Sequence, residues 1–360
     1  MFGLIAYEEI YGNEDKYIFI DVRSPKEARE EPMIGSINIP VLLDEERDVV
    51  GTLYVRESTE AAKEQGIEFI SKRLPKIFKQ IQEIYNNRNG KELVIFCARG
   101  GMRSGSLQAL LNSLKINCYK LQGGYKFYRK FIVKKLEDFS KETNFIVLYG
   151  NTGVGKTEML YKLEERGYDI LDLEGCANHR GSILGGVGLG DCNTQKRFDA
   201  LAYDKLRHRK TNLVFIEGES KRIGRILIPD PLFEKMYEGE KIRITASPEV
   251  RAKRLVKDYT SCENVNEQLI EALSVLKRHI SEERVEHYKN LVSKGDYTTV
   301  ALELMEKYYD PMYGNSAKKR TFRTELNIDD IENELYKLEK IYNEISEELK
   351  KESKEDIHEQ

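Results

Sequence analysis

The sequence lacks tryptophan and is poor in proline and cysteine, with 8 prolines and 5 cysteines among 360 residues. The number of cysteines is odd and no two have C-x-x-C spacing, which argues against a disulfide framework and against a structural zinc site. We therefore expect reduced thiols in a cytoplasmic protein. Four of the cysteines are interpreted as small buried hydrophobic residues, namely Cys118, Cys176, Cys192 and Cys262.

Long hydrophobic runs and an excess of positive charge are also missing. No segment approaches the roughly 18 apolar residues of a membrane span, and residues 1–16 contain neither a cationic leader nor a signal-like apolar stretch. We expect no contact with a membrane. The formal net charge is -3, so an RNA partner would have to bind a local basic patch. Nothing in the sequence indicates an oligomeric state.

What the sequence does contain is two successive α/β patterns. Apolar runs at 17–22 and 92–97 predict buried strands, and residues 60–87 have helical spacing that we expect Pro75 to interrupt. Strands that alternate with helices indicate a doubly wound parallel sheet, which we assign to a domain at 1–135. The second pattern predicts an α/β domain at 140–310, with strands in 144–150, 168–175, 212–219 and 241–248.

The last segment, 311–360, is predicted to be a C-terminal helical tail. Its apolar residues keep helical spacing on one face, which predicts an amphipathic helix. They are Ile328, Ile331, Leu335, Leu338, Ile341 and Ile345.

The segment FCARGGMRS (96–104) contains the candidate nucleophile, Cys97. It follows a predicted strand and precedes a predicted helix, where backbone N–H groups converge. Nearby Arg99 and Arg103 add positive charge, and both effects favour the thiolate. Gly100 and Gly101 let the loop curl into an anion-binding nest. The alternative is a buried cysteine at the end of a strand.

The segment GNTGVGKT (150–157) fits G-x-x-x-x-G-K-[ST], between a predicted strand and a predicted helix. The glycines Gly150, Gly153 and Gly155 let backbone amides surround a diphosphate. Lys156 neutralises its charge, and Thr157 is the candidate ligand for Mg²⁺. A loop of this kind binds a diphosphate that need not belong to ATP, and no clear Walker B aspartate follows.

Four further residues are candidates for a second part of this site. Glu217 and Glu219 follow a predicted strand and either orient metal-bound water or simply face solvent. His179, in a glycine-rich segment beside Arg180, is either an acid–base or phosphate-binding residue or an ordinary loop histidine. A basic helical face made by Arg251, Arg254 and Lys257 either clamps a phosphate or is solvated.

Basic residues alternate with aromatic ones between Lys120 and Lys135, without an acid. Such a pattern suits single-stranded RNA, whose bases stack on aromatic rings. It is equally typical of a basic helix between two domains. The candidate RNA-binding residues are Lys126, Arg129 and Lys130, with residues 318–323 as a weaker second patch.

The first 130 residues or so resemble a rhodanese (sulfurtransferase) domain. The resemblance rests on IDVRSPKEA (20–28), IGSINIP (34–40) and the Cys97 loop. The spacing from Cys97 to Arg103 is C-x5-R, one residue longer than in most rhodaneses and shared with a phosphatase branch of that fold. The longer loop suits a larger tetrahedral or chalcogen-bearing group better than thiosulfate.

The order FCARGGMRS, LYGNTGVGKTEML, LEGCANHRGS and IEGESKRIG, followed by YYDPMYGNS (308–316), resembles the bacterial tRNA 2-selenouridine synthases. The resemblance implies conversion of wobble 2-thiouridine in tRNA to 2-selenouridine with selenophosphate, through an S-geranyl intermediate made from geranyl diphosphate. It also implies that Cys97 receives selenium as a selenylsulfide while Arg99 and Arg103 bind the departing phosphate. We further infer that the Lys156 loop binds geranyl diphosphate. No tightly bound cofactor is expected.

Three other functions remain open from the sequence. The C-x5-R loop favours a phosphatase or arsenate-reductase-like enzyme, but leaves the second domain without a role. A P-loop kinase or NTPase regulated by its rhodanese domain would depend on Lys156 and not on Cys97. An RNA-binding or sulfur-relay adaptor would bind tRNA without changing it.

Overall fold

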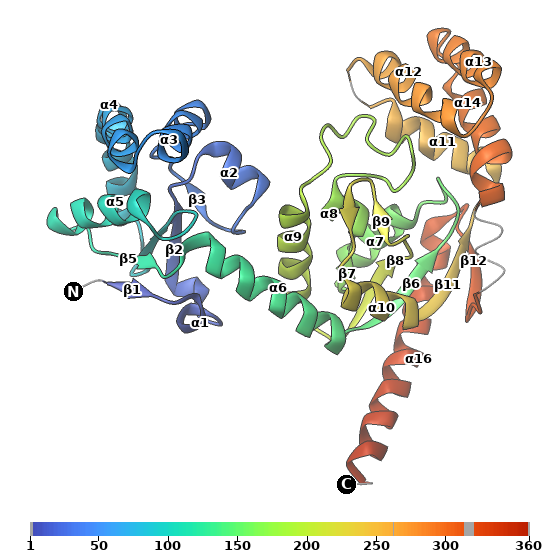
Figure 1. The fold of residues 1–360 in the computed structure, drawn as a ribbon. Helices are drawn as coiled ribbons and strands as arrows, with labels where there is room; N and C mark the ends of the chain where they lie inside the picture. The colour runs from blue at the N-terminus through green and yellow to red at the C-terminus, as the bar shows by residue number, and fades with distance from the viewer. Residues whose placement is uncertain (1–2, 262, 313–319, 359–360) are drawn as a thin grey trace. The chain divides into compact units, whose positions relative to one another are not determined.

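The structure is a computed structural model, and it describes residues 3–261, 263–312 and 320–358. The chain forms two compact units. The first comprises Met1–Leu136 with Asp199–Tyr203, and the second comprises Glu137–Phe198 with Asp204–Gln360. Each unit contains a five-stranded parallel sheet with helices, so the predicted α/β class is confirmed for both (Figure 1).

The sheet of the first unit has the strand order β1-β5-β4-β2-β3, and every neighbouring pair is parallel. The apolar runs of the sequence form its central strands, since a strand covered on both faces needs side chains that can be buried on both. The strands are β1 (Leu4–Ile5), β2 (Tyr17–Asp21), β3 (Ile37–Asn38), β4 (Glu92–Phe96) and β5 (Cys118–Leu121).

The helix predicted at 60–87 is confirmed, but without the expected interruption. Pro75 does not interrupt its helix, which runs unbroken over 28 residues. The Pro75 side chain is exposed, and Ile77 and Ile81 on the next turns are buried in the core, so packing outweighs the one lost hydrogen bond. The helices are α1 (Tyr7–Ile10), α2 (Pro25–Glu30), α3 (Asp44–Arg56), α4 (Thr59–Asn86), α5 (Met102–Ser113) and α6 (Gly124–Glu142).

The sheet of the second unit has the order β12-β11-β6-β8-β7, again parallel throughout. Its strands are β6 (Asn144–Tyr149), β7 (Ile170–Leu171), β8 (Leu213–Glu217), β11 (Glu240–Thr245) and β12 (Thr324–Asn327). A short antiparallel hairpin, β9 (Arg222–Ile223) and β10 (Ile226–Leu227), follows β8. The helices beside the sheet are α7 (Lys156–Glu165), α8 (Leu173–Ala177), α9 (Gln195–Arg207) and α10 (Asp230–Glu238).

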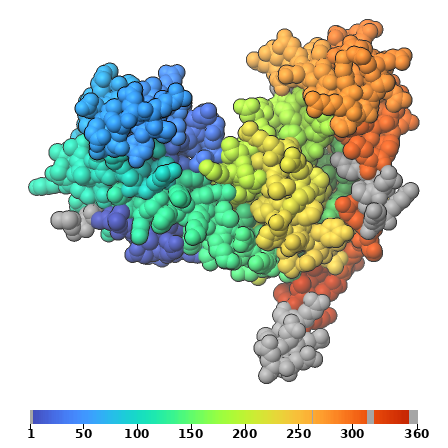
Figure 2. Space-filling view, in the orientation of Figure 1, coloured from blue at the N-terminus to red at the C-terminus, as the bar shows by residue number. Residues whose placement is uncertain are grey.

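Between β11 and β12 the chain makes a helical excursion with its own apolar core. It comprises α11 (Pro248–Tyr259), α12 (Val265–Val275), α13 (Glu282–Ser293), α14 (Tyr297–Leu304) and a π-helical turn at Met305–Tyr309. Buried side chains from all four helices pack together with Leu184 and Val187 of the glycine-rich segment. Figure 2 shows α12 to α14, in orange, packed closely against one another.

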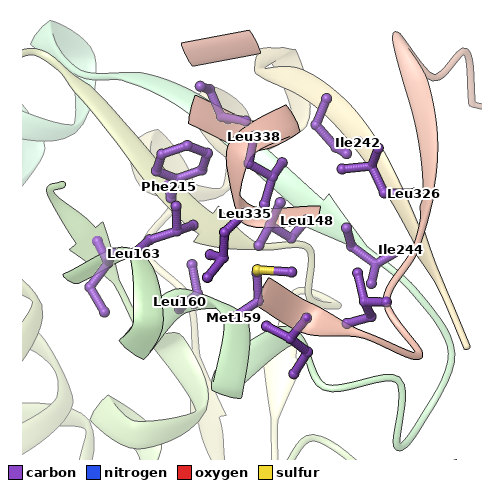
Figure 3. Packing of buried hydrophobic residues seen from close by; sticks show 14 of the residues in the cluster. Leu148, Met159, Leu160, Leu163, Phe215, Ile242, Ile244, Leu326, Leu335 and Leu338 are labelled. Carbon is purple, nitrogen blue, oxygen red and sulfur yellow. The ribbon is translucent and has the colours of Figure 1, made fainter. Parts of the chain in front are cut away.

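The C-terminal segment contributes both a strand and a helix to the second unit. The predicted amphipathic helix is confirmed as α16 (Ile331–His358), whose Leu335 and Leu338 pack against the sheet and α7 (Figure 3). Strand β12 was not predicted, and Ile328 lies just after it rather than in the helix. Among the described residues, none of the helices is long and apolar enough to cross a bilayer.

Candidate functional site

Cys97 lies directly after β4, in the loop that leads into α5. Its side chain is buried, and its Sγ atom is 3.2 Å from the hydroxyl oxygen of Ser104. Ser104 is itself fully buried on the first turn of α5. The loop therefore places the thiol at the N-terminal end of a helix, as the sequence predicts.

The pKa of the Cys97 thiol is lowered from its ordinary value. Burial acts to raise the pKa, but it is outweighed by hydrogen bonds from the Ser104 side chain and from the backbone of Ser104 and Arg99. The positive charge of Arg103 adds to this effect. The thiolate, which is the reactive form of cysteine, is thus stabilised in a buried position.

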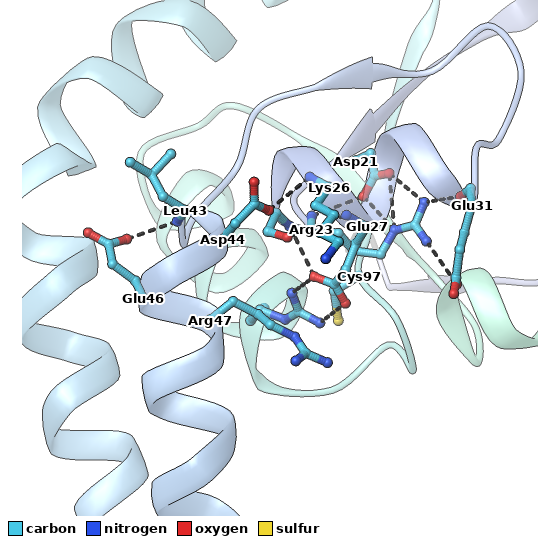
Figure 4. Close-up of polar contacts among 12 residues, drawn as sticks. Asp21, Arg23, Lys26, Glu27, Glu31, Leu43, Asp44, Glu46, Arg47 and Cys97 are labelled. Atoms are coloured by element: carbon cyan, nitrogen blue, oxygen red, sulfur yellow. Dashed lines mark hydrogen bonds and ion pairs between the residues drawn. The ribbon is translucent and has the colours of Figure 1, made fainter. Parts of the chain in front are cut away.

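The two arginines of the loop differ in their surroundings. Arg103 donates hydrogen bonds of 2.6 and 3.1 Å to the carboxylate of Glu27, which comes from α2 (Figure 4). Although burial opposes it, this interaction lowers the pKa of Glu27. Arg99 is exposed to solvent. Because Arg103 is already paired with Glu27, a bound anion would share it with that carboxylate. Anion binding by Arg99 and Arg103 stays a prediction.

A second glycine-containing turn supports the Cys97 loop from behind. The backbone N–H groups of Tyr125 and Lys126 donate to the carbonyls of Cys97 and Ala98, both at 2.9 Å. Gly124 has a φ of +57°, and a Cβ atom there would lie 2.2 Å from the Cys97 carbonyl oxygen. Only glycine fits this contact, so the sequence Gly123-Gly124 fixes the position of the nucleophile loop.

Replacing Ser104 with alanine is expected to raise the pKa of Cys97, because the hydroxyl hydrogen bond to the thiolate is lost. The pH dependence of alkylation by iodoacetamide measures this pKa. Ser106→Ala is the matched control, since Ser106 lies on the same helix but is exposed, and its hydroxyl donates to the Met102 carbonyl. Equal alkylation profiles for the two variants would contradict the assigned role of Ser104.

The P-loop lies between β6 and α7, as its motif predicts. Gly155 has a φ of +97° and precedes the first helical residue, Lys156. The Lys156 ammonium donates to the Gly150 carbonyl at 3.3 Å and lies 3.8 Å from the carboxylate of Glu219. Lys156 thus lies inside the loop beside an acidic residue of the neighbouring strand end.

Glu217, the last residue of β8, is fully buried, which rules out the interpretation that it faces solvent. It accepts a hydrogen bond of 3.4 Å from the hydroxyl of Thr157. Because β8 is the immediate neighbour of β6, the end of β8 brings a carboxylate to the helix that follows the P-loop. Thr157 and Glu217 offer the hard oxygen atoms that Mg²⁺ prefers when substrate phosphates complete its coordination.

Glu174 is a site residue that the sequence analysis missed. Its backbone N–H donates to Glu217 at 2.7 Å, and burial raises the pKa of its carboxyl to about 8, with repulsion from Glu219 adding to the effect. The protonated form of the Glu174 carboxyl is therefore favoured, with Glu219 and Lys156 as its charged neighbours. Among the described residues, no group of three or more histidine, cysteine or acidic side chains is arranged to hold a metal ion. Binding of Mg²⁺ stays a prediction.

These carboxyl groups predict a pH-dependent stability. Glu174 stays protonated in the folded protein up to about pH 8, whereas it ionises near pH 4.3 when unfolded. The unfolded state binds fewer protons between these values, so stability falls as pH rises through this window. We expect the melting temperature to fall between about pH 5 and pH 8, and Glu174→Gln to flatten that slope. Glu234→Gln, at an exposed position on α10, is the control; equal slopes in both variants would refute the assignment.

The arginines of α11 bind the backbone of the P-loop rather than solvent. Arg251 donates to the Thr152 carbonyl at 3.0 Å and pairs with Asp310. Arg254 donates to the Val154 carbonyl at 2.7 Å. Their guanidinium groups thus stabilise the loop's shape, and only Lys257 of the predicted face is exposed.

His179 is enclosed by glycines of the two neighbouring turns. Cβ atoms at Gly185 and Gly224 would lie 2.8 and 2.9 Å from its ring. Burial lowers the pKa of His179, with the charge of Arg180 acting in the same direction, and its Nδ1 atom is buried without a hydrogen-bond partner. Arg180 donates to the carbonyls of Val187 and Asp258. The neutral form of His179 is thus favoured, and the function of both residues stays a prediction.

The basic stretch begins at the end of β5 and continues into the first part of α6. Lys126 and Lys130 are exposed, whereas Arg129 pairs with Asp199. Tyr125 and Tyr128 are buried and pack in the core of the first unit, so they are not available to stack on bases. In the second patch, Lys318 and Lys319 lie outside the described residues, and Arg323 pairs with Glu348.

Comparison with known proteins adds a second line of evidence. A family model described as the tRNA 2-selenouridine synthase AAA domain matches residues 143–336, and one described as the rhodanese-like domain matches residues 6–131. The chain belongs to the tRNA 2-selenouridine synthase family. The residues matched by the AAA-domain model include the P-loop of the second unit. Those matched by the rhodanese-like model include the Cys97 loop.

Named tRNA 2-selenouridine synthases are similar over most of the chain. The protein of Aeromonas salmonicida is 30% identical over 86% of this chain and 91% of its own. The synthase of Pseudomonas fluorescens is 31% identical over 89% of this chain and 93% of its own. With the synthase of Nitrosomonas europaea the identity is 32%, over 67% of this chain and 63% of the other. A crystal structure of an N-terminal domain from Clostridium difficile 630 is 41% identical over 36% of this chain and 98% of that chain, with a TM-score of 0.34.

Proposed function

We propose that this protein converts 2-thiouridine at the wobble position of tRNA to 2-selenouridine, using geranyl diphosphate and selenophosphate in two successive steps. Membership of the tRNA 2-selenouridine synthase family supports the overall reaction. The observation that carries the proposal is the buried Cys97 thiol, whose pKa is lowered by Ser104 and Arg103 although burial opposes this. A stabilised thiolate at the N-terminal end of a helix is suited to react with an electrophilic chalcogen or phosphorus compound.

The first step is assigned to the P-loop. The sulfur of 2-thiouridine forms a bond to C1 of the geranyl group, and the C1–oxygen bond breaks to release diphosphate. The N3 proton of the base is lost to solvent, so the S-geranyl product is neutral. Lys156 and the loop amides stabilise the negative charge that develops on the departing diphosphate. Mg²⁺ held by Thr157 and Glu217 would neutralise more of this charge. Alkylation makes the sulfur a better leaving group for the second step.

The second step is assigned to the Cys97 loop. The Cys97 thiolate can attack selenophosphate at either of two atoms, and the oxidation state of the phosphorus product differs between these two routes. If the thiolate attacks selenium, the S–Se bond forms and the Se–P electron pair leaves with phosphorus, so the product is phosphite and a further thiol must later reduce the selenylsulfide. If it attacks phosphorus, a phosphocysteine forms and selenide departs. The selenide displaces geranylthiol from C2 of the base, and water then releases phosphate from the phosphocysteine. Both routes place Cys97 at the reacting atoms.

The tRNA partner is proposed to contact the first unit at the exposed ammonium groups of Lys126 and Lys130, beside the exposed ring of Phe127. All three lie on α6, close in sequence to the turn that supports the Cys97 loop. Lysines that bind phosphates contribute a salt-dependent affinity that does not depend on base sequence.

The test is nucleoside mass spectrometry of 2-thiouridine-containing tRNA after incubation with the protein, geranyl diphosphate and then selenophosphate. Formation of S-geranyl-2-thiouridine followed by 2-selenouridine is the expected result. Phosphorus NMR of the inorganic product separates the two routes at Cys97. Unchanged tRNA with every donor would refute the proposal, and turnover of a phosphate monoester or of ATP instead would indicate a phosphatase or an NTPase.

A further inference from the structure

The helical excursion of the second unit contains an apolar slot that adjoins the P-loop. Its unoccupied space is about 530 Å³, counting the part that is open to solvent. The walls come from α11, α12, α13, α14 and the π-helical turn, and nearly all of the lining is hydrocarbon. Among the lining residues are Leu184, Leu255, Leu269, Val292, Val300 and Ala301.

The slot reaches the P-loop at Thr152, which belongs to both. The next residue, Gly153, packs against Leu255: a Cβ atom at Gly153 would lie 2.8 Å from that side chain. Arg251 holds the Thr152 carbonyl at 3.0 Å, so this junction is fixed by a buried guanidinium. A molecule bound by the loop amides therefore has an apolar surface immediately beside it.

The acidic side of the site also borders the slot. Gly181 passes so close to the carboxylates that a Cβ atom there would lie 2.9 Å from Glu219 and 3.1 Å from Glu174. The following residue, Ser182, lines the slot and bonds to the hydroxyl of Tyr259 at 3.2 Å. The Ser182 and Tyr259 hydroxyls thus bond to each other, so an apolar ligand that covers them leaves this hydrogen bond in place.

We infer that this slot binds the isoprenoid chain of a short prenyl diphosphate whose diphosphate lies in the P-loop. The inference rests on the proposed function. It adds where the isoprenoid chain binds and which chain length the protein prefers. A diphosphate cradle next to a hydrocarbon slot matches a ligand with a charged head and an apolar tail. A nucleotide base would instead need several hydrogen-bond partners in the slot, whereas nearly all of the lining is hydrocarbon.

Calorimetric titration of the full-length protein with three ligands tests the inference: geranyl diphosphate, dimethylallyl diphosphate and inorganic diphosphate, each with Mg²⁺. Burying five more carbons should make geranyl diphosphate bind at least about tenfold more tightly than dimethylallyl diphosphate. Ala301→Phe, which fills the slot, should abolish that preference while leaving the affinity for inorganic diphosphate unchanged. Ala301→Val, a smaller change, should reduce the preference in part.

Thr298→Phe adds the same ring on the exposed face of α14 and should behave as the wild type. A chain-length preference that persists in both Ala301 variants, with their melting temperatures unchanged, would overturn the inference and leave the proposed function intact. The proposed function fails separately if geranyl diphosphate binds with this chain-length preference but 2-thiouridine in tRNA is not alkylated. Binding of all three ligands with equal affinity to the wild type would also overturn the inference.

Discussion

Cys97→Ala is expected to abolish formation of 2-selenouridine, with a loss of about 10³-fold or more, as for the removal of a reacting nucleophile. The same variant should still alkylate tRNA, so that S-geranyl-2-thiouridine accumulates. The reason is that the thiolate belongs to the second step only, whereas the first depends on the P-loop. Mass spectrometry of nucleosides from tRNA treated with both donors measures the two products in one sample.

Cys192→Ala is the control, because Cys192 is a free, partly exposed thiol at a distant position in the sequence, in the second unit. It should retain both activities. Loss of alkylation together with selenation in Cys97→Ala, with an unchanged melting temperature, would contradict the division of the two steps between the loops. Full selenation by Cys97→Ala would remove Cys97 from the mechanism.

Lys156→Ala is expected to have the opposite phenotype. Without its ammonium group the P-loop loses the charge that stabilises the departing diphosphate, so S-geranylation should fall by about 10² to 10³-fold. When tRNA that already carries S-geranyl-2-thiouridine is supplied, the variant should convert it to 2-selenouridine at the normal rate. Comparison of the two substrates measures the two steps separately.

Lys162→Ala provides the matched control, because Lys162 lies on the same helix, α7, and pairs with Glu332 of α16 at the surface. It should leave both steps unchanged. If Lys156→Ala alkylates normally, the P-loop does not bind the prenyl donor. If it fails to convert pre-alkylated tRNA, the loop acts in both steps.

The two loops were predictable from the sequence because each is specified locally. A strand, a turn with glycines at fixed positions and a helix determine where Cys97 and Lys156 lie, and all of these parts are consecutive in the chain. The apolar face of α16 was also predictable, because it is specified by a local pattern. A periodic pattern needs no knowledge of what it packs against.

The features that escaped prediction depend on contacts between distant segments. Glu174 becomes part of the site only because β8 brings Glu217 to its backbone N–H. Strand β12 is short and polar, and it is defined by its pairing with β11. The aromatic residues between Lys120 and Lys135 suggest base stacking in the sequence, yet Tyr125 and Tyr128 are buried in the core. The apolar slot likewise combines side chains from four helices and shows no stripe of its own.

The position of β12 and α16 has a consequence for the order of folding during translation. All five strands of the first unit have been synthesised by residue 121, whereas the second sheet gains its edge strand only at 324–327 and its covering helix after that. Until residues 326–345 leave the ribosome, the side chains that pack on them, such as Leu148 and Ile242, remain uncovered. Chains that end early therefore expose an apolar sheet surface, the kind of surface that promotes aggregation and recognition by chaperones.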